Sequence, residues 1–130
     1  MPLPPNLVPF HEIPNFPILD EETLAQLQEV DDGGMELTKE MFAIFLADTP
    51  PRLSAIKTGV DSIDTKALRE VAHALKGACG TIGAVRVQHI SALLEAYGRG
   101  IDVESSPSEL LTGLAEAFSE AQDAFKKYLG

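Results

Sequence analysis

The C-terminal part of the chain carries apolar residues at the spacing of a helix that packs along other helices. Ser106 can cap this helix, with Pro107 in the first helical position and Glu109 three residues after the cap. Beyond the cap the apolar residues alternate three and four positions apart: Leu111, Leu114, Phe118, Ala121, Phe125 and Tyr128. This seven-residue repeat predicts a helix that lies nearly antiparallel to its neighbours in a bundle.

Four earlier segments also show helical patterns, and none of the chain shows the alternation typical of a strand. We expect these helices at about 20–30, 36–59, 65–81 and 85–97, with Asp31-Asp32-Gly33-Gly34 ending the first. Thr49-Pro50-Pro51 interrupts the second, which either kinks there or restarts with Thr49 as a cap. The pattern predicts an all-α fold, an up-down antiparallel four-helix bundle with a short extra N-terminal helix and an extended arm.

The arm is the proline-rich segment 1–17, which contains six of the nine prolines of the chain. Each proline fixes φ and removes a backbone donor, so we expect an extended or polyproline-like conformation and no helix. Apolar residues lie between the prolines, which predicts that part of the arm packs against the domain formed by residues 18–130.

The net charge of the chain limits the classes of partner that it is expected to bind. The 130 residues carry a formal net charge of -10, which disfavours nucleic acid and anionic membranes because phosphates require a dense basic surface. No apolar run reaches the roughly 20 residues of a membrane helix, and the N-terminal residues show neither the basic region nor the apolar core expected of a signal peptide. We therefore expect a cytoplasmic monomer, and the initial Met favours a free-standing chain. Cys79 is the single cysteine and is expected to be buried.

The helix at 65–81 has two distinct faces. At about 100° of rotation per residue, the pole opposite His73 is apolar and predicts the core side. It consists of Leu68, Val71, Leu75, Ala78 and Ile82. The side centred on His73 holds three cations and two glycines, namely Lys66, Arg69, Lys76, Gly77 and Gly80. His73 is therefore expected to face solvent.

The two glycines on the exposed face indicate that this surface is kept open for a partner. Each costs the helix about 1 kcal/mol relative to alanine, and neither relieves a clash in the core. Gly77 and Gly80 instead leave the imidazole of His73 open to a second macromolecule. An exposed imidazole is largely neutral and nucleophilic, and Lys76, one turn away, can neutralise phosphoryl oxygens. Lys66 and Arg69 are candidates for docking a partner.

The motif His73-Ala74-Leu75-Lys76-Gly77, followed by Gly83-Ala84, resembles the phosphorylation motif of histidine-containing phosphotransfer (HPt) domains. The resemblance covers roughly residues 18–129. It implies that His73 accepts a phosphoryl group from a receiver-domain aspartate and passes it to another receiver. It also implies that Lys76 steadies the phosphoryl group and that Gly77 opens the surface.

The implied partners are the receiver domains of response regulators and of hybrid histidine kinases. The chain lacks a phosphate-binding loop, a kinase signature and a cluster of metal-binding carboxylates, so it is not expected to be an enzyme or to hold a cofactor. Mg²⁺ is expected on the partner receiver instead.

Several other interpretations compete with this one. A module of the same fold could dock on or inhibit a kinase or receiver without carrying phosphate, and a bundle enzyme could depend on a metal. Glu70 and His73 have the Glu-x-x-His spacing of di-iron bundles, but they point outward and have no second copy. Glu95 could orient His73 in principle, but its angular position favours a solvated side chain. His89 is expected to be structural.

Overall fold

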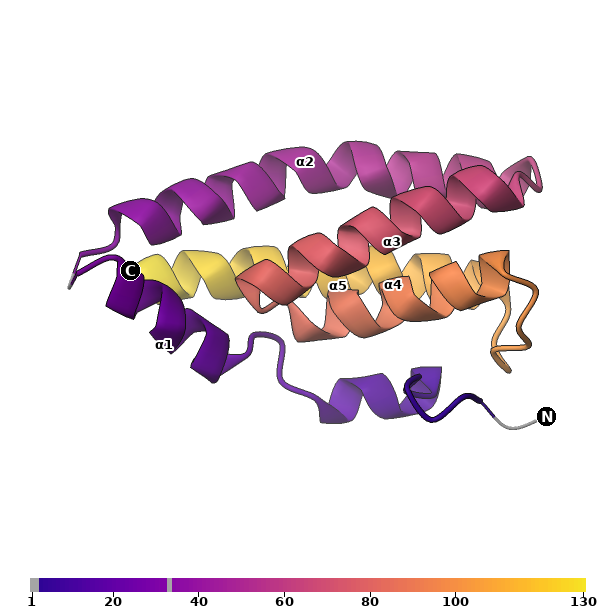
Figure 1. Cartoon of the computed structure of the whole chain (residues 1–130), viewed down its shortest axis with the longest axis horizontal. Helices are drawn as coiled ribbons and strands as arrows, with labels where there is room; N and C mark the ends of the chain where they lie inside the picture. The colour runs from indigo at the N-terminus through magenta and orange to yellow at the C-terminus, as the bar shows by residue number, and fades with distance from the viewer. Residues whose placement is uncertain (1–2, 33) are drawn as a thin grey trace.

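The computed structural model describes residues 3–32 and 34–130, and every named element in it is a helix (Figure 1). In chain order these are the 3-10 helix η1 (Phe10–Asn15) and the α-helices α1 (Glu21–Val30), α2 (Glu36–Asp61), α3 (Thr65–Ile82), α4 (Val85–Gly98) and α5 (Pro107–Leu129). Met1 and Pro2, predicted in the arm, and Gly33, predicted in the turn after α1, lie outside the described residues. None of the described helices is long and apolar enough to span a membrane.

Helices α2, α3, α4 and α5 run side by side and enclose the core (Figure 1). α3 packs against α2 and α4, while α5 closes the other side against the same two helices. The stripe predicted on α5 faces this core: Leu114, Phe118, Ala121 and Phe125 are buried, and Leu111 and Tyr128 are partly buried. The ring centroid of Phe125 lies 4.1 Å from that of Phe42, which joins α5 to α2.

α2 continues through Pro50 and Pro51 without a break, so the alternative that a second helix restarts there was wrong. Thr49 does not cap a new helix. Its buried hydroxyl donates a hydrogen bond to the carbonyl oxygen of Phe45 at 2.6 Å, as a residue inside a helix can do. Both prolines are exposed, so water can reach the carbonyl groups that lose an amide partner.

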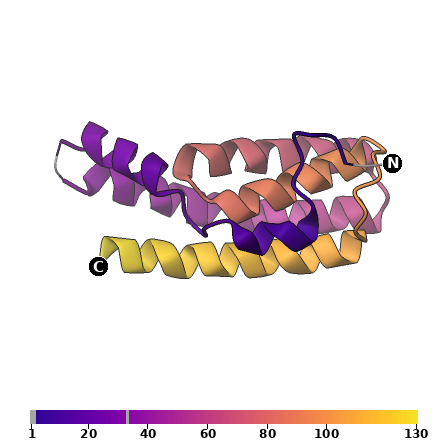
Figure 2. The same ribbon diagram turned by 90° about the horizontal axis from the view of Figure 1, so that it is seen from below.

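The arm differs from the extended conformation that its prolines predicted, because residues 10–15 form η1. A 3-10 turn needs only bonds between residues three apart, such as that from the Glu12 amide to the Pro9 carbonyl at 2.9 Å. Pro14 removes one donor, and the fixed φ of proline suits this geometry. As expected, part of the arm lies against the helices: Ile13 is buried, and η1 packs on α4 (Figure 2).

Candidate functional site

α3 begins and ends as its sequence dictates, and this sets which side chains it exposes. The Asp64 carboxylate caps its first turn by accepting from the Ala67 amide at 3.1 Å, and Gly83 ends it with a φ of +82°. Between these ends, Leu68, Ala72, Leu75, Cys79 and Ile82 are buried. His73 lies on the other side, with its side chain 67% exposed.

Glu95 of α4 reaches across to this imidazole. Its carboxylate Oε2 lies 2.7 Å from Nδ1 of His73, and its Oε1 accepts from Lys76 Nζ at 2.6 Å. Arg99, the residue that follows the last residue of α4, donates to Oε2 at 3.3 Å. The carboxylate therefore joins two residues of the predicted motif to a third cation.

The expectation that Glu95 is solvated was wrong, since its side chain is only 7% exposed. The error has a packing cause, because α3 and α4 approach each other closely. At Gly98, a Cβ atom would lie 2.7 Å from Cγ of Arg69 on α3. Gly98 of α4 was the sequence signal of this approach. Arg99 was missed for the same reason, because its role depends on where Glu95 lies.

Glu95 is ionised at neutral pH despite its burial. Burial by itself raises the pKa of the carboxyl group, but hydrogen bonds from Lys76, His73 and Arg99 outweigh it and hold the pKa below the ordinary value of 4.5. An ionised carboxylate can only accept hydrogen bonds. In the neutral imidazole of His73 the proton therefore lies on Nδ1, and the lone pair of Nε2 is free.

The remaining motif residues are placed unequally around this group. Gly77 is exposed, and a Cβ atom built there would have nothing within 4 Å. At Gly80 a Cβ atom would lie 3.3 Å from Nε2 of Gln88, so this position borders α4 as well as solvent. Among the predicted cations, only Lys76 reaches the site.

The cationic stripe predicted around His73 is less positive than expected. Lys66 lies 3.9 Å from Glu70, a pair between exposed side chains, and Arg69 is partly buried along Gly98. The charge immediately beside the imidazole is the Glu95 carboxylate. The predicted charges all lie on one helix, whereas the site is assembled from two.

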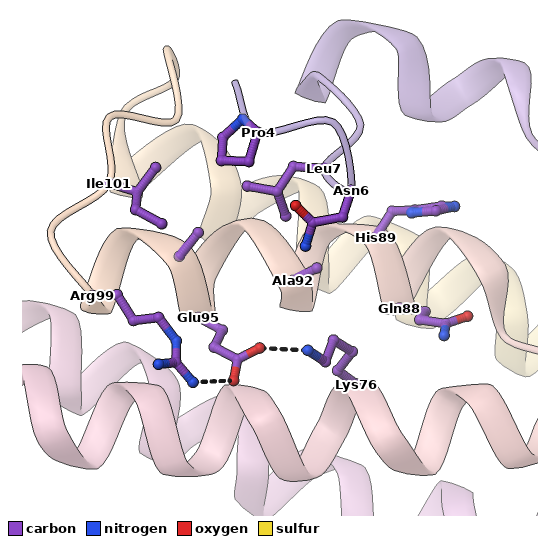
Figure 3. A pocket seen from close by; sticks show the side chains of 11 residues that line it. Pro4, Asn6, Leu7, Lys76, Gln88, His89, Ala92, Glu95, Arg99 and Ile101 are labelled. Atoms are coloured by element: carbon purple, nitrogen blue, oxygen red, sulfur yellow. Dashed lines mark hydrogen bonds and ion pairs between the residues drawn. The ribbon is translucent and has the colours of Figure 1, made fainter. Parts of the chain in front are cut away.

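A pocket of about 270 Å³ opens beside this group, between α3, α4 and the arm (Figure 3). Lys76, Glu95 and Arg99 contribute its charged side chains, while Asn6 and Gln88 add amides. Pro4, Leu7, His89, Ala92, Ala96 and Ile101 complete the wall.

His89 and Cys79 were expected to be structural, and neither forms a hydrogen bond or ion pair with His73. The ring of His89 lies 4.6 Å from that of Phe16, and burial lowers its pKa. Cys79 is buried, and burial raises the pKa of its thiol to about 12. Within residues 3–32 and 34–130 there is no group of three or more His, Cys, Asp or Glu side chains that could hold a metal ion.

Comparisons with known proteins identify the family of the chain. The model of a family described as "Hpt domain" matches residues 40–124. Among solved structures, the chain is similar to histidine-containing phosphotransfer protein B (HptB) from Pseudomonas aeruginosa PAO1, with a TM-score of 0.75 and 29% sequence identity. That match covers 86% of this chain and 94% of the other. No curated protein matches the chain.

Proposed function

The chain belongs to the Hpt domain family and is a histidine phosphotransfer protein of phosphorelay signalling, and on this basis we propose that His73 carries the phosphoryl group. One observation carries the assignment. His73 is exposed, its Nδ1 is engaged by a buried carboxylate at 2.7 Å, and its Nε2 is left free as a nucleophile. The other two histidines lack such a carboxylate partner among the described residues.

In the proposed step, Nε2 attacks the phosphorus atom of an aspartyl phosphate on a receiver domain. The N–P bond forms as the P–O bond to the aspartate breaks, and the aspartate leaves as a carboxylate. The imidazole keeps its Nδ1 proton and becomes cationic, so Glu95 stabilises the product more than the neutral ring. The receiver is expected to supply the Mg²⁺ that such phosphoryl transfer requires.

Lys76 has the second role in this proposal. It lies one turn after His73 and can turn from Oε1 of Glu95 toward the phosphoryl oxygens. Arg99 would then remain on Glu95 and keep a cation beside the buried carboxylate. Glu95 and Arg99 are therefore positioning residues, because they act through His73 and Lys76.

The docking face is proposed to surround His73 on α3. The open surface at Gly77 allows a receiver backbone to approach, and Gly80 extends that surface toward α4. Lys66 and Arg69 lie on the N-terminal half of α3, where they would form the edge of the contact. The partners are receiver domains of response regulators and hybrid histidine kinases.

The protein is proposed to act as a phosphoryl carrier that is not itself an enzyme. We infer that α2–α5 form an up-down antiparallel four-helix bundle, with α1 and the arm added at its N-terminal side. Such a bundle is a rigid support for one exposed imidazole. It works as a monomer, since the second half of the reaction site comes from the receiver.

The function is tested with a phosphorylated receiver domain carrying a radioactive phosphoryl group in the presence of Mg²⁺. We expect wild type and His11→Gln to become labelled, with a label that is acid-labile and base-stable, and His73→Gln to remain unlabelled. His11 is the matched control because it is also an exposed histidine. Labelling of His73→Gln would overturn the assignment. Binding of the receiver without labelling of wild type would favour the docking module instead.

A further inference from the structure

The arm brings a tight turn to the edge of the pocket beside His73. The Leu7 amide donates to the Pro4 carbonyl at 3.0 Å, and this closes a turn whose central residues, Pro5 and Asn6, are exposed. Figure 3 shows Pro4, Asn6 and Leu7 on one side of the pocket and Lys76 on the other, with α4 between them. The turn and the site therefore share one hollow.

The segment of the arm that follows the turn is held in place by contacts that lie outside the site. Arg86 of α4 donates to the carbonyl oxygens of Phe16 at 2.8 Å and Pro14 at 3.0 Å. Gly113 of α5 leaves room for the ring of Phe10, because a Cβ atom there would lie 2.5 Å from Cε1 of that ring. These contacts fix residues 10–16 of the arm to α4 and α5, directly after the turn in the chain.

The typical size of a protein–protein interface indicates how far a docked receiver would extend from His73. A stable contact buries about 800 Å² on each partner, which corresponds to a disc of about 16 Å radius. The pocket would be about 8 Å across if it were spherical, and its wall includes Glu95, which touches His73. A contact of this size centred on His73 is therefore wide enough to include residues at the edge of the pocket, such as Asn6.

The charge of the pocket suits the same partner. Lys76 and Arg99 place two cations against the single carboxylate of Glu95. The phosphorylation site of a receiver is acidic, since carboxylates hold its Mg²⁺. On docking, the cations at the pocket would therefore lie close to the carboxylates of the receiver.

We propose that the arm turn Pro4–Leu7 is part of the receiver-docking surface and helps to select which receiver binds. This proposal rests on the proposed function of His73. It assigns a role to the segment before residue 18, which lies outside the stretch matched by the family model. The partner that contacts the edge of the pocket is the docked receiver domain.

The test changes the charge of one exposed asparagine and compares it with another on the same arm. Asn6 lines the pocket, whereas Asn15 is exposed at the end of η1 and does not line it. We expect Asn6→Glu to lower kcat/KM for transfer from a phosphorylated receiver by roughly tenfold at low salt, and Asn6→Lys to raise it. Asn15→Glu and Asn15→Lys should leave it unchanged. The effects at Asn6 should shrink as salt screens them.

A small phosphoramidate donor separates docking from chemistry, because it reaches His73 without an interface. All four asparagine variants should be labelled by it at the wild-type rate. Equal effects at Asn6 and Asn15, or no effect at Asn6, would overturn the proposal. So would a change in labelling by the small donor, since the arm would then act on His73 directly. If wild type accepts no phosphoryl group from any receiver, the proposed function itself fails, which is a different result.

Discussion

At the scale of single residues, the site depends on a carboxylate that is buried and still charged. Glu95 receives hydrogen bonds from three donors, and together they outweigh the cost of removing it from water. The same bonds orient the imidazole of His73 and hold Lys76 within one turn of it. A single carboxylate thus links the nucleophile to the cation that would meet the phosphoryl group.

Glu95→Gln should lower the free energy of unfolding by about 1–3 kcal/mol at pH 7, because Lys76 and Arg99 lose their charged partner. The folded-state pKa of Glu95 is below the ordinary value of 4.5, so its contribution is fully present above that pH. It is lost as the pH falls below 4.5 through the folded-state pKa. Urea unfolding of both proteins across this range measures the difference between them.

The control for this prediction is Glu70→Gln, which changes an exposed glutamate whose only cationic partner among the described residues, Lys66, lies 3.9 Å away. Its unfolding free energy should stay close to that of wild type at every pH, as expected for an exposed pair. A wild-type advantage over Glu95→Gln that stays constant from pH 7 to pH 3 would contradict the coupling of Glu95 to stability.

At the scale of elements, α3 has a buried face that holds it in the bundle. On its exposed face, Gly77 leaves one position beside His73 without a side chain. Gly77 stabilises nothing in the fold, because the space around it is open. Gly59 of α2 is different, since a Cβ atom there would lie 3.2 Å from Cβ of Leu68 and 3.3 Å from its backbone. Substitution by alanine is therefore expected to change the free energy of unfolding in opposite directions at Gly77 and Gly59.

Gly77→Ala should raise the free energy of unfolding by about 1 kcal/mol, as expected for an exposed helix interior. Gly59→Ala should lower it, because α2 and α3 must separate slightly to admit the methyl group. Thermal or urea unfolding of the two variants measures both effects. A loss of stability in Gly77→Ala would show that the helix face is less open than the structure indicates.

Gly77→Arg separates the surface from the chemistry. A long side chain beside His73 should block transfer from a phosphorylated receiver while labelling by a small phosphoramidate donor continues. Transfer rates for the two donors, measured on the same variant, provide the test. Normal transfer from the receiver would show that docking does not need the open surface at Gly77.

At the scale of the whole molecule, the arm is part of the folded unit. Ile13 lies in the same buried core as the residues of α2–α5. Phe16 packs on His89, and Arg86 also reaches Glu120 of α5 at 3.2 Å. The arm therefore connects α4 to α5. Its earlier residues Pro4, Asn6 and Leu7 line the pocket beside His73.

Gly113→Ala should loosen this connection, because the added methyl group would displace the ring of Phe10. We expect a loss of about 1–3 kcal/mol in the free energy of unfolding. Hydrogen exchange should become faster at the amides of Glu12 and Phe16, whose bonds define η1, while the amides of α3 keep their protection. Unchanged exchange in η1 would show that the ring of Phe10 does not hold the arm.

The features that the sequence alone determined are those set by neighbours a few residues apart. The helical character of 65–81, the cap at Ser106 and the outward position of His73 all follow from local spacing, and the structure agrees with them. The Hpt resemblance was also readable, because the motif from His73 to Gly77 lies within two turns of one helix.

Only the tertiary structure decided which groups meet across helices. His73 and Glu95 are 22 positions apart, and their contact exists because α3 and α4 pack closely, with Gly98 leaving room for Arg69. The same holds for η1, whose 3-10 turn is supported by Arg86 and Gly113 from two other helices. Local spacing sets the direction of a side chain along its own helix, but the partner it reaches depends on the distance and rotation between helices.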